Sequence, residues 1–142
     1  MVYATFLGTM LIVLTSVIHF SALNWMSRKN VYTKRPSNFT TFWAVSGVFV
    51  LHMFEIILYA FAYWFAEQVL QIGSLEGLGA NIPYDYLYYS TVTFTSLGIG
   101  DIFPTGHIRF LTGVEALNGL LLIAGSASFI YFALSNVWKW ER

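Results

Sequence analysis

The run SLGIG offers main-chain oxygens as ligands for a cation. It consists of Ser96, Leu97, Gly98, Ile99 and Gly100. Gly98 and Gly100 can adopt backbone conformations forbidden to residues with a side chain, so consecutive carbonyls can face one axis. Copies of this strand around such an axis would surround a dehydrated cation with oxygens, and Ser96 would add a ring of hydroxyls. The chemistry predicted here is ion coordination without any covalent change.

Ionisable residues inside apolar stretches form a second group of candidates, because charges at membrane depth are costly and are often functional. His52 and Glu55 are spaced so that both lie on one face of a helix, and Glu115 and Asn118 share the same spacing. We expect the two pairs to meet across helices. Two interpretations stay open. The one we favour is a hydrogen-bonded network that fixes helix register, and the other is a proton sensor coupled to a pore.

Residue types suited to metal binding or covalent catalysis are poorly represented. The chain has no cysteine, which excludes disulfides, thiolate catalysis and cysteine-bound zinc or iron-sulfur sites. His19, His52 and His107 lie in separate segments without a close ligand pair, so we expect no transition-metal site. Asp85 and Asp101 lie outside the apolar stretches, where they cannot form a catalytic pair at membrane depth. We therefore predict neither an enzyme nor a cofactor.

The composition is that of a membrane protein. Of the 142 residues, 57% are hydrophobic and 10% are charged, which is too apolar for a soluble surface. The net charge is zero and the basic residues form no single face, so a nucleic-acid partner is not expected. A helix needs about 20 apolar residues to cross a bilayer. We predict an all-α integral membrane fold with three transmembrane helices at 1–25, 41–70 and 108–138.

A basic linker separates the first two predicted helices. Residues 26–40 carry Arg28, Lys29, Lys34 and Arg35, so the positive-inside rule makes this linker cytoplasmic. That places the amino terminus outside and the carboxyl terminus inside a cell membrane, as a multi-pass protein surrounded by lipid. The few residues after the last helix predict no cytoplasmic ligand-binding domain in this chain.

A helix too short to span the bilayer lies between the second and third spans. Residues 71–83 contain three glycines and are predicted to form an exposed, flexible turret. Residues 84–95 would form a helix about 18 Å long, which can only enter the membrane and turn back. Residues 96–101 follow, and irregular backbone at that depth must be buried in protein or line a wet path. We therefore interpret residues 41–142 as a pore domain and residues 1–25 as an additional helix.

The run YYSTVTFTSLGIGDIFP, residues 88–104, resembles the pore helix and selectivity filter of potassium channels. The signature of that family is a threonine-rich stretch, then T-V-G-Y-G-D and a nearby proline. The chain looks like a small bacterial two-transmembrane potassium channel with one additional N-terminal helix. The resemblance implies a homotetramer that conducts K+ passively. Its K+ would bind at Ser96, Leu97, Gly98 and Ile99.

Some residues near the filter depart from the family pattern. Ile99 replaces an aromatic residue that packs behind the filter, so an aromatic brace is missing here. Val92 stands where some bacterial members have a glutamate that braces the filter. Tyr89 occupies the place of a tryptophan that bonds the filter aspartate, so we expect Tyr89 to donate a hydrogen bond to Asp101. Tyr88 and Thr95 complete the residues expected to support the filter.

Gly119 resembles the hinge of the family's inner helix. On that alignment Ile123, Ala127 and Tyr131, spaced four apart, would face the central cavity and the inner mouth. Close helix packing is an equal alternative role for the other glycines of this helix, Gly113 and Gly125.

The predicted function is a subunit of a potassium-selective channel, with K+ as the permeant ion. The nearest alternative is a weakly selective monovalent cation channel, because Ile99 replaces the aromatic filter residue. A nonconducting accessory membrane subunit is the alternative from a different class. Conduction by the purified chain alone would exclude that last possibility.

Overall fold

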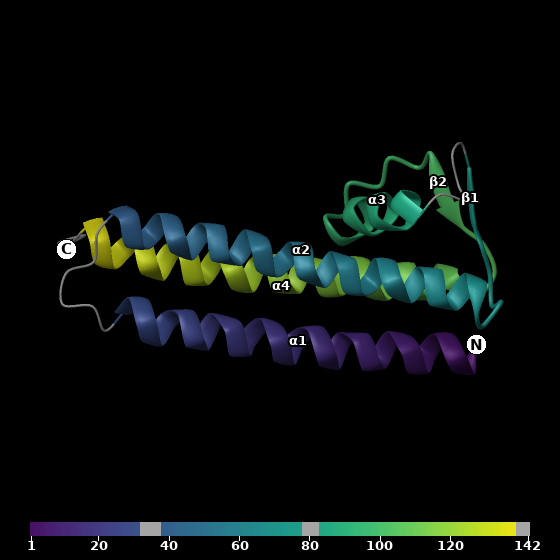
Figure 1. Cartoon of the computed structure of the whole chain (residues 1–142), viewed down its shortest axis with the longest axis horizontal. Helices are drawn as coiled ribbons and strands as arrows, with labels where there is room; N and C mark the ends of the chain where they lie inside the picture. The colour runs from purple at the N-terminus through teal and green to yellow at the C-terminus, as the bar shows by residue number, and fades with distance from the viewer. Residues whose placement is uncertain (32–37, 78–82, 139–142) are drawn as a thin grey trace.

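The computed structural model describes residues 1–31, 38–77 and 83–138, and three long helices dominate this part of the chain. The elements in order are α1 (Val2–Val31), α2 (Asn38–Gln68), β1 (Leu75–Gly77), α3 (Pro83–Phe94), β2 (Ile102–Pro104) and α4 (Ile108–Trp138). The long helices α1, α2 and α4 run side by side, and the short helix α3 lies with the strands at one end of the bundle (Figure 1). The amino terminus lies at that same end, and α4 finishes at the opposite one (Figure 1).

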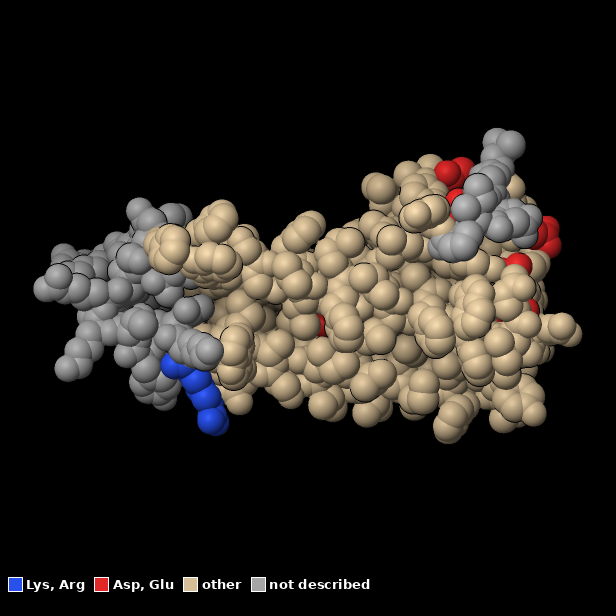
Figure 2. All heavy atoms as spheres, viewed as in Figure 1, with Lys and Arg blue, Asp and Glu red and all other residues tan. Residues whose placement is uncertain are grey.

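Each long helix is suited to cross a bilayer. Among the described residues, the three apolar spans are Val2–Arg28, Phe42–Gln68 and Ile108–Ser135. Their 27 or 28 residues exceed the roughly 20 that a hydrocarbon core requires. On the face in Figure 2, acidic side chains gather around α3 and the strands, whereas basic side chains lie near the opposite end. Residues other than Asp, Glu, Lys and Arg cover most of the surface between those ends (Figure 2).

The helices on either side of the basic linker are longer than we predicted. The linker was expected to occupy residues 26–40, but α1 continues to Val31 and α2 already begins at Asn38. Burial favours the extension of α1, because Met26, the first residue past the predicted end, is buried in one cluster with Leu23 and with Val48 of α2. The central part of the linker, with Lys34 and Arg35, lies outside the described residues, as do residues 139–142.

A short antiparallel sheet replaces part of the predicted turret. Leu75 pairs with Pro104 and Gly77 pairs with Ile102, so β1 holds the segment that follows residues 96–101. The strands lie very close here, because a Cβ on Gly77 would sit 2.0 Å from the carbonyl oxygen of Asp101. The expectation of an exposed loop over 71–83 was therefore wrong for Leu75, which is buried. Residues 78–82 of that segment lie outside the described part of the chain.

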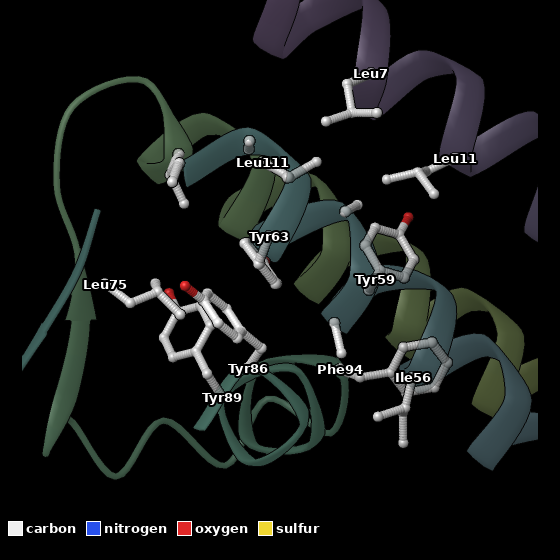
Figure 3. Packing of buried hydrophobic residues seen from close by; sticks show 14 of the residues in the cluster. Leu7, Leu11, Ile56, Tyr59, Tyr63, Leu75, Tyr86, Tyr89, Phe94 and Leu111 are labelled. Atoms are coloured by element: carbon white, nitrogen blue, oxygen red, sulfur yellow. The ribbon is translucent and has the colours of Figure 1, made fainter. Parts of the chain in front are cut away.

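Aromatic rings fill the space between α2 and α3. Tyr59 and Tyr63 of α2 are fully buried, and Tyr63 meets the ring of Tyr89 edge to face at a centroid separation of 5.0 Å. Leu7 and Leu11 of α1 lie on the other side of this core, near Tyr59 (Figure 3). Buried aromatic pairs in this geometry add to the free energy gained by burial. The packing fixes α3 on the bundle, and with it the starting point of the segment after α3.

α4 approaches the end of α3 most closely at Gly119. A Cβ added at Gly119 would lie 2.2 Å from the carbonyl oxygen of Phe94, which leaves no room for any side chain. α4 is helical throughout this region, from Ile108 to Trp138. The glycine therefore has a packing role in the structure, and a hinge at this position stays a prediction.

We expect Gly119→Ala to push α3 and α4 apart and to lower the free energy of unfolding by about 1–3 kcal/mol. Gly113→Ala is the matched control on the same helix, because no described atom lies within 4 Å of its added Cβ. Alanine has the higher helix propensity, so the control should melt at the same temperature or higher. Thermal unfolding of the purified protein in detergent measures both. Equal midpoints for the two variants would contradict the close contact.

Candidate functional site

The backbone of residues 96–100 alternates between two conformations. Ser96, Gly98 and Gly100 have φ of 56°, 59° and 85°, whereas Leu97 and Ile99 have no positive φ. An alternation of left- and right-handed residues allows successive carbonyls to point to the same side of a strand. An ordinary strand would point them alternately to opposite sides. The left-handed φ costs Ser96 roughly 1–2 kcal/mol, because it carries a side chain.

The carbonyls of this segment are free to bind a ligand. Its first N–H groups are used by α3: Leu97 N donates to Val92 O at 2.9 Å and Ser96 N to Thr93 O at 2.9 Å. Within the described part of the chain, no donor bonds to the carbonyl oxygens of residues 96–100. All five residues are exposed, with Leu97 67% and Ile99 57% accessible in the single chain. Exposed carbonyl oxygens without a donor are the type of ligand that coordinates dehydrated cations in channel filters.

Asp101 is held by Tyr88 rather than by Tyr89. The Tyr88 hydroxyl donates to Asp101 Oδ2 at 2.8 Å, and Ile102 N donates to Oδ1 at 3.0 Å. The expected bond from Tyr89 was wrong, because this ring is turned into the core and its hydroxyl pairs with Thr112 at 2.9 Å. Since the Asp101 carboxylate holds the hydroxyl proton, the pKa of Tyr88 is raised above its usual value.

The remaining support residues act through their backbone and their packing. Val92 is buried and its carbonyl accepts the N–H of Leu97, which ties the segment to the last turn of α3. The hydroxyl of Thr95 bonds back to Thr91 O at 2.8 Å. A cavity of about 380 Å³ lies behind the segment, bounded by Tyr89, Val92 and Thr112 among others. Ile99 does not line this cavity, so its side chain does not brace its own strand.

Comparison with known families agrees with this geometry. The sequence pattern of an ion-channel family matches residues 39–136, well over half of the chain. The chain belongs to this ion-channel family. The match runs from α2 through α3 into α4, whereas all of α1 lies outside it. No curated protein and no solved structure gives a significant match.

Family membership and the apolar helices together make the channel a multi-pass membrane protein. They also favour transport over catalysis. The residues expected to face its cavity, Ile123, Ala127 and Tyr131, are all exposed on α4 in the single chain. That exposure in the single chain fits a surface facing water, lipid or another copy of the channel.

The intramembrane polar residues of the channel form separate networks. Glu115 accepts a bond from Tyr63 and lies beside Ser90, whose hydroxyl is also 2.9 Å from the carbonyl oxygen of Ile56. The Ser90 hydroxyl has a single proton and cannot donate to both Glu115 and the Ile56 carbonyl. A protonated Glu115 that donates to Ser90 Oγ would leave the Ser90 proton for Ile56, so that every group has a partner. The expected meeting of Glu115 with His52 and Glu55 was wrong, because Glu115 bonds to Tyr63, farther along α2, and to Ser90 of α3.

Asn118 binds the extra helix α1 rather than the histidine pair. Its amide donates to Thr15 Oγ1 at 2.8 Å and to the Tyr59 hydroxyl at 3.1 Å. Thr15 had no role in the sequence interpretation. Its place on the buried stripe of α1, four residues from Leu11 and from His19, is the periodic signal that could have found it.

His19 and His52 meet at Glu55, which corrects the expectation that the histidines lie apart. His19 Nδ1 is 2.8 Å from Glu55 Oε1, and His52 Nδ1 is 3.0 Å from Oε2. The separation of His19 and Glu55 by 36 positions hid this contact from any argument based on spacing. The third histidine, His107, is exposed just before α4.

We expect Ser90→Ala to destabilise the channel by about 1–3 kcal/mol, because it leaves the buried Glu115 and the carbonyl of Ile56 each short of a partner. Ser128→Ala is the control, since Ser128 is exposed on α4 and, among the described residues, its hydroxyl bonds to the carbonyl of Ala124 on its own helix. Chemical or thermal unfolding in detergent compares the two. A loss in Ser128→Ala as large as that in Ser90→Ala would speak against a structural role for this network.

Proposed function

We propose that the chain is a subunit of a homotetrameric, potassium-selective channel that conducts K+ passively. The observation that carries the proposal is the alternating backbone of residues 96–100, whose carbonyls are unpaired in the described chain. Four copies around one axis would stack rings of these oxygens, which replace the water shell of K+. The K+ ligands would come from Ser96, Leu97, Gly98 and Ile99.

Surface exposure supports assembly around such an axis. Leu97 and Ile99 are more than half exposed in the single chain, as are Leu117 and Leu121 of α4. A strand this apolar would not face water as a monomer, and its polar backbone would not face lipid. Neighbouring copies supply the surroundings that satisfy both requirements.

Electrostatics around the segment favour a cation. α3 ends at Phe94, two residues before Ser96, so the negative end of its helix dipole points toward the inner end of the proposed filter. Glu76 and Asp101 are exposed near the other end. Acidic side chains at a pore entrance raise the local concentration of cations. Because these acidic groups and Arg28 lie at opposite ends of the helix bundle, we place α3 and the amino terminus outside the cell and the carboxyl terminus inside.

Ile99 favours a second candidate, a weakly selective monovalent cation channel. Its side chain is 57% exposed and has no hydroxyl to bond behind the filter, so the ring spacing would be held less firmly. The bond between Tyr88 and Asp101 lies beside the same end of the segment and favours the selective form. Reversal potentials in mixed K+ and Na+ distinguish the two candidates.

The decisive experiment is ion flux through the purified protein in liposomes. We expect barium-sensitive K+ flux that exceeds Na+ flux at least about tenfold. Gly100→Ala should abolish it, because alanine resists a φ of 85° and the last carbonyl would turn away from the axis. The added methyl group meets no described atom within 4 Å, so the tetramer should persist on size-exclusion chromatography.

Gly113→Ala serves as the control for this experiment, since its glycine lies in a regular helix with open space around it in the described chain. It should conduct normally. Selective flux through Gly100→Ala at the normal rate would refute the filter assignment, and absence of flux through a tetrameric wild-type protein would favour an accessory subunit.

Tyr88→Phe should make conduction less stable without changing which ions enter. It removes the donor to Asp101 and lets the outer end of the filter relax, so we expect open times to shorten roughly threefold in single-channel recordings. Tyr84→Phe, on the exposed first turn of the same helix, should leave open times unchanged. Identical open times in the two variants would argue against a brace at Tyr88.

A further inference from the structure

The cluster of His19, His52 and Glu55 joins the extra helix to the pore domain. His19 belongs to α1 and the other two residues to α2, and the ligand atoms of all three lie within 4.8 Å of one another. His19 and Glu55 have fully buried side chains, while that of His52 is 16% exposed. None of these residues belongs to the proposed filter.

We propose that His19, His52 and Glu55 bind a divalent transition-metal ion of the Zn2+ class. Two imidazole nitrogens and one carboxylate oxygen are a typical ligand set for Zn2+, with a fourth position left for water. Nδ1 of His19 lies beside one carboxylate oxygen of Glu55 and Nδ1 of His52 beside the other. Neutral imidazoles and an ionised carboxylate would give the occupied site one positive charge.

The distances require only small movements. Bonds of about 2.0–2.1 Å in a tetrahedral site place neighbouring ligand atoms roughly 3.3 Å apart. The nitrogen-to-oxygen distances are 2.8 Å from His19 Nδ1 to Oε1 and 3.0 Å from His52 Nδ1 to Oε2. One ligand atom from each residue lies within 4.8 Å of the others, so shifts of about 1–2 Å would bring three ligands to tetrahedral spacing. His52 has the most freedom to adjust, because its side chain is 16% exposed whereas those of His19 and Glu55 are fully buried.

Ser126 of α4 prepares His19 for the metal. Its hydroxyl lies 3.2 Å from His19 Nε2, on the side of the ring away from Glu55. Without metal, the Nδ1–H of the ring donates to Glu55 and the serine donates to Nε2. With metal on Nδ1, the ring proton moves to Nε2 and the serine accepts it. A partner on the second nitrogen that suits both tautomers is the usual support of a metal-binding histidine.

A metal ion at this site would lie close to the inner end of the proposed filter. The ring of His52 lies between His19, at a centroid separation of 5.3 Å, and Phe94, at 5.7 Å. Phe94 is the last residue of α3 and contacts Gly119 of α4. A shift of His52 onto a metal would therefore alter the packing of the residue that precedes the filter segment. The binding site itself does not depend on whether the chain conducts.

Co2+ is a suitable probe, because a site with nitrogen and oxygen ligands gives it visible absorption bands. We expect the purified full-length channel in detergent to bind one Co2+ per chain and Zn2+ to displace it. His19→Ala and His52→Ala should each weaken binding by at least about tenfold, whereas His107→Ala should bind normally. His107 is the matched control because it is exposed and lies outside the cluster.

Folding is checked in the same samples. Zn2+ should raise the unfolding midpoint of the wild-type protein and of His107→Ala, and not that of His52→Ala, whose partly exposed side chain is the least disruptive to remove. The proposal fails if the wild-type channel binds no Co2+, which would leave a cluster that holds protons only. It also fails if binding survives in a folded variant lacking both His19 and His52, or is lost in His107→Ala.

Discussion

A backbone carbonyl at membrane depth needs a partner, and this constraint governs how the channel is built. Helices satisfy the requirement within themselves, which explains why α1, α2 and α4 carry most of the chain. Residues 96–100 do not satisfy the requirement in this way. Their first N–H groups donate to carbonyls in the last turn of α3, whereas their own carbonyls have no partner among the described residues. Backbone of this kind is tolerated at membrane depth only where it is buried in protein or lines a water-filled path. The pore that we propose supplies such a path, with water and the permeant ion as partners of the carbonyls.

Such a strand must be held at both ends if its oxygens are to stay in register. At its base, Phe94 is pressed against Gly119, where α4 leaves no space for a side chain. At its outer end, Tyr88 holds Asp101, and β2 pairs with the strand that follows α2. The backbone bond from Thr105 N to Ser74 O, 2.8 Å long, continues that attachment. The segment is thus held by contacts at its two ends, with α4 and with the strand that follows α2, and not by its own side chains.

The sequence predicted the features that depend on local length and composition. Long apolar runs gave the three spans, and α3 begins at Pro83 and ends at Phe94, one residue earlier than expected at each end. Contacts that depend on rotation about a helix were not predictable. Neighbouring residues on a helix differ by about 100°, which turns Tyr88 toward Asp101 and Tyr89 into the core. The strand pairing of Leu75 and the meeting of His19 with Glu55 join distant segments, and no local pattern reports them.

Polar contacts explain how α1 is attached to the rest of the chain, although α1 lies outside the part that matches the family pattern. In lipid the hydrophobic effect does not draw helices together, so close packing and hydrogen bonds between helices must do so. α1 buries a single stripe that includes Leu11, Thr15 and His19. Thr15 bonds to Asn118, and His19 bonds to both Glu55 and Ser126. Such bonds contribute on the order of 0.6 kcal/mol each, so no single one decides whether α1 stays attached. The cluster of His19, His52 and Glu55 can therefore exchange a proton for a metal ion, as we propose, while the other contacts of α1 keep the helix attached.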